Sequence, residues 1–223
     1  MAKSKIIKEL ANNEITMEVA LNRLLIIASD LNNEDLADWA SAELHGYCKD
    51  MDLPAYRQKK SAHFIYSGIN GNFQVNNQPF TYLEILAEHD ATLFDVPIMD
   101  SVSALQDFVD NYEKRTYCRN YTWMNGYVYE KTGIMCTSII QHVPLNFLQN
   151  ILSDIKTRLL RVLIKLDKEY GCLDDSDIDT TVKTIEEVEE INRIVNNYIF
   201  IDNSVHVGNN NKIDKSEIIT GGN

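Results

Sequence analysis

The amino-acid sequence predicts an α+β fold, with an N-terminal helical hairpin, a small antiparallel sheet and a long C-terminal core helix. Apolar residues recur every three or four positions in residues 16–47 and again in residues 144–171, which is the spacing of amphipathic helices. Between these segments lie short runs of β-branched and aromatic residues with Asn-Gly turns. An amphipathic helix and a short β-solenoid-like tail are expected after the core.

The N-terminal region is predicted to contain three helices. The first covers residues 4–11, and the second begins after Thr16, whose hydroxyl is a suitable N-cap. Asn32 and Asn33 interrupt this second helix, and a third helix then continues to Gly46, a residue that favours a helix C-terminus. The second and third helices should form an αα-hairpin because so few residues connect them.

The middle of the chain is predicted to supply the sheet. Pro54 ends the helical region, and strands are expected over residues 63–66 and 73–75. Residues 82–88 fit a helix and a strand equally, whereas a short helix is expected after Asp100 as its N-cap. Alternation in Tyr127-Val128-Tyr129 and in residues 136–140, with turns at 125–126 and 132–133, predicts two or three strands over residues 116–143.

The C-terminal third begins with Pro144, which is expected to open the long core helix that Gly171 ends. Acidic residues then concentrate between Asp167 and Glu190, which indicates a boundary near residue 171. Apolar residues recur every three or four positions from Val182 to Tyr198, so a second amphipathic helix is expected outside the main body. The predicted parts are therefore a core over 1–171, an acidic linker and helix over 172–198, and an Asn-rich tail over 199–223.

The tail alternates apolar and polar residues and then reaches an Asn-rich turn, like one rung of a β-solenoid. A lone strand pair is marginal in water, whereas stacked tails of neighbouring subunits would satisfy one another's backbone groups. We therefore expect the tail to mediate homo-oligomerisation; a chain end with incidental alternation is the alternative. The residues expected to form this ladder are Ile199, Ile201, Val205, Val207, Asn209, Asn210, Asn211 and Ile213.

Charge and composition exclude several classes of protein. The net charge of -12 opposes binding to nucleic acid or to anionic membranes. No apolar run approaches the roughly 18 residues of a membrane span, and no signal-peptide core follows the basic N-terminus, so we expect a cytoplasmic protein. The four cysteines and five histidines lack metal-ligand or disulfide-framework spacing, so no metal site and no cofactor are expected.

No familiar catalytic motif is present: there is no nucleophile elbow, P-loop or dinucleotide fingerprint. The weak catalytic candidates are Arg57 and His63, whose separation fits the loose arginine-to-histidine spacing of HEPN-type ribonucleases. Those enzymes place the pair at the start of a helix in a bundle, whereas here the pair follows Pro54 and opens a strand-like run. The sequence therefore favours a protein that is not an enzyme.

The third helix and the segment after it carry a more specific pattern. Asn33-x-x-Leu36-x-x-Trp39-x-x-x-Glu43-Leu44-x-Gly46-Tyr47, followed by Leu53-Pro54-x-Tyr56-Arg57, resembles the N-terminal signature of AbiTii-like abortive-infection proteins. The long helix also resembles the last core helix of that family, so the likeness spans roughly residues 5–171. The motif residues that could contact a partner are Trp39, Glu43, Gly46, Tyr47, Tyr56, Arg57 and Arg158.

This resemblance implies bacterial defence against phage, in which the infected cell stops growing or dies before progeny are released. It implies no catalytic residues. Glu43 and Arg57 could pair with each other or face a partner. We expect a protein that acts through protein contacts and self-assembly, with a phage protein or a neighbouring defence protein as a further partner. A growth-arresting toxin with an unrecognised nuclease activity, and a sensor or antitoxin subunit of a two-component system, remain alternatives.

Overall fold

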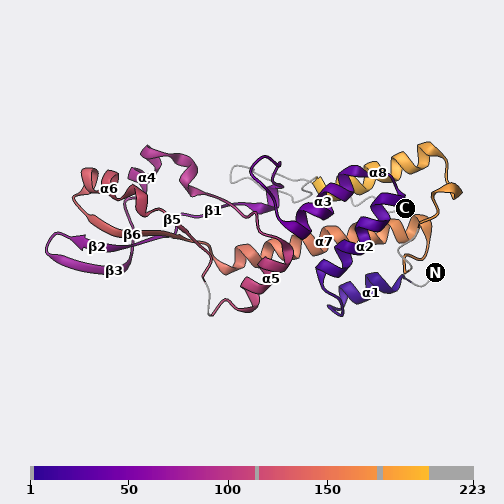
Figure 1. The fold of residues 1–223 in the computed structure, drawn as a ribbon, viewed down its shortest axis with the longest axis horizontal. Helices are drawn as coiled ribbons and strands as arrows, with labels where there is room; N and C mark the ends of the chain where they lie inside the picture. Colours follow the sequence, from indigo (N-terminus) through magenta and orange to yellow (C-terminus); the bar gives the residue numbers. More distant parts are fainter. Residues whose placement is uncertain (1–2, 114–115, 175–177, 201–223) are drawn as a thin grey trace, which may run out of the picture.

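The computed structural model describes residues 3–113, 116–174 and 178–200. These residues form an elongated molecule with helices at one end, here called the helical body, and a sheet covered by two short helices at the other, the sheet lobe (Figure 1). The helical body contains α1 (Lys5–Ala11), α2 (Met17–Asp30), α3 (Glu34–His45), α5 (Val102–Asp110), α7 (Leu145–Tyr170), η4 (Thr180–Val182) and α8 (Ile185–Phe200). The sheet lobe contains β2 (Phe64–Asn70), β3 (Phe73–Pro79), α4 (Leu83–His89), η2 (Ala91–Phe94), β5 (Cys118–Asn120), η3 (Thr122–Met124), α6 (Asn125–Thr132) and β6 (Met135–His142).

A two-stranded antiparallel ribbon connects the two ends. It pairs β1 (Gln58–Lys60), which follows the short helix η1 (Ala55–Arg57), with β4 (Asp95–Pro97). Both strands lie between the helical body and the sheet lobe (Figure 1). The chain therefore passes between the two ends several times, and residues near 57 and 98 are held side by side.

The helical body confirms the predicted N-terminal hairpin and the long core helix. The Thr16 hydroxyl accepts the backbone N–H of Val19 and so caps α2, as expected. Helices α2 and α3 pack against each other, and the 26-residue helix α7 packs against α1, α2, α5 and α8 with its apolar stripe buried. This stripe and the inner faces of α1, α2, α3 and α5 form one continuous apolar core.

The acidic helix does not extend away from the core, and this corrects our expectation. Helix α8 packs against α7 and α3, and it buries Ile191, Val195 and Ile199 in the same apolar core. It begins at Ile185 rather than Val182, which is 67% exposed in η4. The physical reason is the apolar stripe itself, because about 1.5–3 kcal/mol is gained for each large apolar side chain that leaves water.

The sheet lobe contains a four-stranded antiparallel sheet in the order β3-β2-β6-β5. Helices α4 and α6 cover one face of this sheet (Figure 1). Phe64 and Tyr66 of β2 and Ile139 of β6 point to that face and join a second apolar core, separate from that of the helical body. The expected strands at 63–66, 73–75 and 136–140 are thus present with small shifts of their ends.

Two local predictions were wrong. Tyr127-Val128-Tyr129 lies in α6 and not in a strand, because Val128 is buried and Tyr127 is partly buried against the second apolar core while Tyr129 is 52% exposed. The N-cap of α5 is Ser101, whose hydroxyl accepts the Ala104 N–H, and not Asp100. The Asp100 carboxylate instead accepts a hydrogen bond from the Tyr117 hydroxyl.

The predicted β-solenoid-like tail over 199–223 lies outside the described residues, except for Ile199 and Phe200, which end α8. Ile199 is 1% exposed, so it belongs to the core and not to a strand ladder. Among the described helices, none is long and apolar enough to cross a membrane.

Candidate functional site

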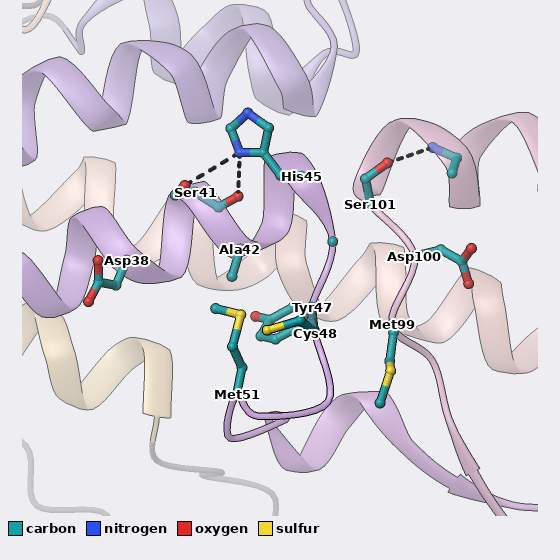
Figure 2. A pocket seen from close by; sticks show the side chains of 12 residues that line it. Asp38, Ser41, Ala42, His45, Tyr47, Cys48, Met51, Met99, Asp100 and Ser101 are labelled. Atoms are coloured by element: carbon teal, nitrogen blue, oxygen red, sulfur yellow. Dashed lines mark hydrogen bonds between the residues drawn. The ribbon is translucent and has the colours of Figure 1, made fainter.

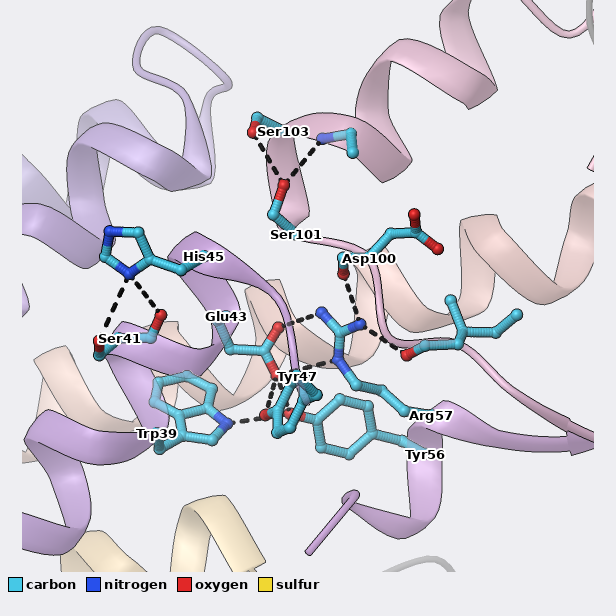
Figure 3. Close-up of polar contacts among 12 residues, drawn as sticks. Trp39, Ser41, Glu43, His45, Tyr47, Tyr56, Arg57, Asp100, Ser101 and Ser103 are labelled. Atoms are coloured by element: carbon cyan, nitrogen blue, oxygen red, sulfur yellow. Dashed lines mark hydrogen bonds and ion pairs between the residues drawn. The ribbon is translucent and has the colours of Figure 1, made fainter. Parts of the chain in front are cut away.

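The motif residues of α3 and η1 converge on one buried cluster, which we call the Glu43–Arg57 lock (Figure 3). Glu43 comes from the last turn of α3, and Arg57 comes from η1, which Pro54 precedes as N-cap. Both side chains are 0% exposed. The sequence brings them together because the connection between α3 and η1 returns the chain to the end of the helix it has just left.

The Glu43 carboxylate is fully used as a hydrogen-bond acceptor. Its Oε1 accepts the Tyr47 hydroxyl at 2.7 Å, the Tyr56 hydroxyl and the Arg57 Nε–H at 3.2 Å, and its Oε2 pairs with Arg57 Nη2. The remaining Arg57 nitrogen, Nη1, donates to the carbonyl oxygens of Ile98 and Asp100 at 2.9 and 2.8 Å. A bidentate pair of this kind is stabilising only when its other donors and acceptors are also satisfied, which is the case here.

Tyr47, Tyr56 and Arg57 of the lock all keep their protons near neutral pH. Burial raises the pKa of the Tyr47 and Tyr56 hydroxyls, and the adjacent Glu43 carboxylate raises it further. Burial alone would lower the pKa of Arg57, but the Glu43 carboxylate outweighs it and the pKa is raised. The tyrosines therefore stay neutral hydrogen-bond donors near neutral pH, and Arg57 stays a cation.

The lock extends to the long helix and to α8. Trp39 donates its indole N–H to the Tyr56 hydroxyl at 2.9 Å, and the Arg158 guanidinium lies 4.6 Å above the Tyr56 ring. Arg158 Nη1 also donates to the carbonyl oxygens of Tyr198 and Ile199, the last turn of α8. Arg158 thus connects the core helix, the motif tyrosine and the end of α8.

Gly46 is the motif position at which the backbone leaves no room for a side chain. Its φ is +89°, and a Cβ there would lie 2.8 Å from the Met99 carbonyl oxygen. The next N–H, of Tyr47, donates to that same oxygen at 2.7 Å. The seven motif residues predicted as candidate interaction residues are therefore brought together, but as an internal joint between α3, η1, the segment before α5 and α7.

A groove of about 900 Å³ lies beside the lock and shares Tyr47 and Gly46 with it (Figure 2). It runs between the C-terminal half of α3 and the segment that leads into α5. Its lining mixes polar groups with thiol and thioether sulfurs: Asp38, Ser41, Ala42, His45, Gly46, Tyr47, Cys48, Met51, Met99, Asp100, Ser101 and Ala104. Sequence reasoning missed this groove because its residues come from two distant segments.

The groove residues Ser41 and His45 do not form a nucleophile and its base. His45 Nδ1 lies 2.9 Å from the Ser41 carbonyl oxygen and 3.4 Å from its hydroxyl. A carbonyl oxygen can only accept, so Nδ1 carries the proton and cannot take one from the Ser41 hydroxyl. The Figure 2 geometry is that of a histidine bonded within its own helix turn.

Arg57 and His63 lie in different environments. His63 is exposed just before β2, with its ring 5.5 Å from that of His142, whereas the Arg57 guanidinium is fully buried and paired. Arg57 therefore cannot reach a phosphate that binds at the surface, and the predicted pair is not assembled for RNA cleavage. Among the described residues, no group of three or more His, Cys, Asp or Glu side chains is arranged to hold a metal ion.

Comparison with known protein families places this chain in one of them. The family model AbiTii matches residues 4–192, which confirms the resemblance predicted over residues 5–171 and carries it past Gly171 into α8. No curated protein and no solved structure shows a significant match. Because the matched segment covers the helical body, the sheet lobe and the first half of α8, the chain belongs to the AbiTii family, whose role is abortive infection in defence against phage.

Proposed function

We propose that this protein acts in abortive infection through protein contacts and self-assembly, and not through a catalytic site. The observation that carries the proposal is the complete burial of the Glu43–Arg57 lock, in which the signature's charged groups bind one another. A catalytic carboxylate or guanidinium must reach its substrate, whereas these groups have no exposed surface. The signature residues therefore stabilise the fold, and the proposed activity depends on residues at the surface of the protein.

Self-assembly is assigned to the tail from residue 201 onward. Its alternation and Asn-rich turn favour a ladder between subunits, which would concentrate several AbiTii domains in one particle. Ile199 is not part of this proposal, because it is buried in the chain's own core.

Phage plating on cells that express the chain with a stop codon after Phe200 tests the role of the tail. This truncation retains the buried Ile199 and the carbonyl groups that Arg158 holds, so it leaves the described fold intact. We expect this truncation to abolish self-assembly, measured by size-exclusion chromatography, and the protection of infected cultures. Protection at the level of the full chain would contradict the proposal.

A matched pair of tail variants refines this test. Val205→Asp with Val207→Asp places two charges within the predicted ladder, and Ile218→Asp with Ile219→Asp places two charges beyond it. We expect assembly and protection to be lost only in the first variant. Equal loss in both would show that added charge, and not a broken ladder, is responsible.

The nuclease alternative is tested by His63→Ala alone. Arg57→Ala is unsuitable, because it leaves the Glu43 carboxylate buried without its partner and would unfold the chain for reasons unrelated to catalysis. His63 is exposed, so its removal should leave the fold and the protection unchanged. Loss of protection with an unchanged melting temperature would favour the nuclease. Absence of protection from every version, the full chain included, would favour a two-component system with a missing partner.

A further inference from the structure

The strands of the sheet lobe are nearly free of charge although the chain is strongly acidic, whereas the helices of the lobe carry charged residues such as Glu88 and Lys131. The chain has 21 basic and 33 acidic residues, yet residues 61–83 contain none of them. The four strands β2, β3, β5 and β6 contain one, Arg119. Arg119 donates to the Asp95 carbonyl oxygen at 2.6 Å and lies against the Tyr121 ring. The sheet itself therefore presents a nearly uncharged surface on the side away from α4 and α6.

This surface includes the sheet face that α4 and α6 leave open (Figure 1). Its side chains alternate with the buried Phe64, Tyr66 and Ile139 and stand opposite one another across β2 and β6. We call it the open sheet face, and it consists of the cross-strand pairs Ile65 with Ile140, Ser67 with Ser138, and Ile69 with Met135. Ile69 is 47% exposed and Met135 is 53% exposed, so about half of each side chain is left open to solvent by the described residues.

Such a face is unusual for a sheet that ends at solvent. Antiparallel sheets with one wet face normally place polar or charged side chains on it, whereas four of these six positions on the central strands are Ile or Met. The outer-strand partners of two of these apolar residues are polar and uncharged, with Gln74 opposite Ile69 and Asn120 opposite Ile140. Serine, at the two remaining positions, is small enough to permit close approach. Uncovered apolar surface of this kind marks a contact with another macromolecule.

The charge of the chain identifies the partner. Two copies that each carry a net charge of -12 repel one another wherever acidic surfaces meet. A two-fold contact places one patch against the same patch, so a patch with a net negative charge would meet the same net negative charge. The open sheet face avoids this repulsion because it has no charge. A nucleic acid would require clustered Lys and Arg, which the strands lack.

We propose that the open sheet face is a homodimer interface, which packs against the same face of a second copy of this chain. Two sheets packed in this way lie about 10 Å apart, with their strands inclined by about 30°. Ile65, Ile69, Met135 and Ile140 of each copy would interdigitate as the apolar centre. This interface lies at the opposite end of the molecule from α8, so it is independent of the proposed tail assembly.

Sedimentation velocity of the full chain tests this proposal. Ile69→Glu with Met135→Glu places two like charges of each copy at the contact, and we expect the dimerisation constant to weaken at least tenfold. Ile26→Glu is the matched control, because Ile26 is 55% exposed on α2 in the helical body and its variant should associate like the wild-type chain. An association constant that the double variant does not change would overturn the proposal.

Charge complementation excludes misfolding as the cause. Ile69→Lys with Met135→Lys should also associate more weakly than the wild-type chain, and an equimolar mixture with the Glu variant should recover the lost association, because opposite charges then meet at the contact. Failure of the mixture to associate would contradict a self-contact. If the Glu variant keeps its wild-type association but loses phage protection, the face binds a different protein and the proposal is wrong. All these chains retain residues 201–223, so failure here leaves the tail assembly untouched.

Discussion

The helical body and the sheet lobe differ in whether they bury charged side chains. The helical body encloses a charged pair, Glu43 with Arg57, at 0% exposure and supplies every hydrogen bond that the carboxylate needs. The sheet lobe encloses aromatic and aliphatic side chains, and the Lys131–Glu88 pair on its helices stays at the surface, at 44% and 63% exposure. The first region therefore uses charge to fix its interior, whereas the second keeps charge away from its sheet.

This difference shows which region is held in one geometry and which region is free to contact another protein. A buried ion pair tolerates one geometry, because any displacement leaves a charge without a partner. An apolar core tolerates exchange of similar side chains, and an uncharged outer face is free to meet another protein. The AbiTii signature in α3 and η1 thus reports on the interior of the helical body.

Removal of the Glu43 charge should produce the largest effect. In Glu43→Gln the Arg57 cation stays buried without a counter-ion, and we expect a loss of about 3–5 kcal/mol in the free energy of unfolding. Glu88→Gln is the matched change in the sheet lobe and should cost less than about 1 kcal/mol, because its pair with Lys131 is solvated. Urea denaturation followed by circular dichroism measures both. Equal losses would show that the lock does not depend on its charge.

Gly46→Ala should have a smaller effect, a loss of about 2–3 kcal/mol in the free energy of unfolding. It combines a backbone φ of +89° with a Cβ that would lie 2.8 Å from the Met99 carbonyl oxygen, so both strain and overlap oppose it. Gly133 in the sheet lobe has a φ of +72° but open space around its Cβ position, so Gly133→Ala should show only the backbone cost of about 1 kcal/mol. Thermal unfolding of the two variants separates overlap from strain. A Gly46→Ala variant as stable as Gly133→Ala would mean that the segment before α5 moves aside freely.

Loss of the Arg158 guanidinium should have a smaller and more local effect. Arg158→Met keeps the approximate length of the side chain but removes the donors to the carbonyl oxygens of Tyr198 and Ile199. We expect a loss of about 1.5 kcal/mol in the free energy of unfolding. Hydrogen exchange should accelerate in the last turn of α8 and little elsewhere. Arg161→Met is the control, since Arg161 is exposed on the same helix. Uniform acceleration over the whole chain would indicate that Arg158 supports the core and not α8.

The sequence predicted the helices of the body well, because Thr16 and Gly171 mark helix ends and apolar residues keep a regular period between them. It predicted α6 poorly, since the β-propensity of Tyr127 and Tyr129 conflicts with the way Val128 packs on the sheet. The motif identified every member of the lock, and the pairing of Glu43 with Arg57 was one of two expected outcomes. Burial decided between them, and burial depends on contacts between distant segments that no local pattern contains.

Acidification should produce the smallest effect, confined to the sheet lobe. Burial, and then the charge of nearby His63, lowers the pKa of His142 below its usual 6.5. The unfolded chain therefore takes up this proton more readily than the folded one, so stability is complete above about pH 6.5 and decreases as the pH falls from there to the folded pKa. Tyr47, Tyr56 and Arg57 do not titrate in this range, because their pKa values are raised. The melting temperature of the wild-type chain should thus fall more between pH 7 and pH 5 than that of His142→Asn. Parallel curves for the two chains would place the acid sensitivity elsewhere, and a reduced slope in His63→Asn would confirm the contribution of the second histidine.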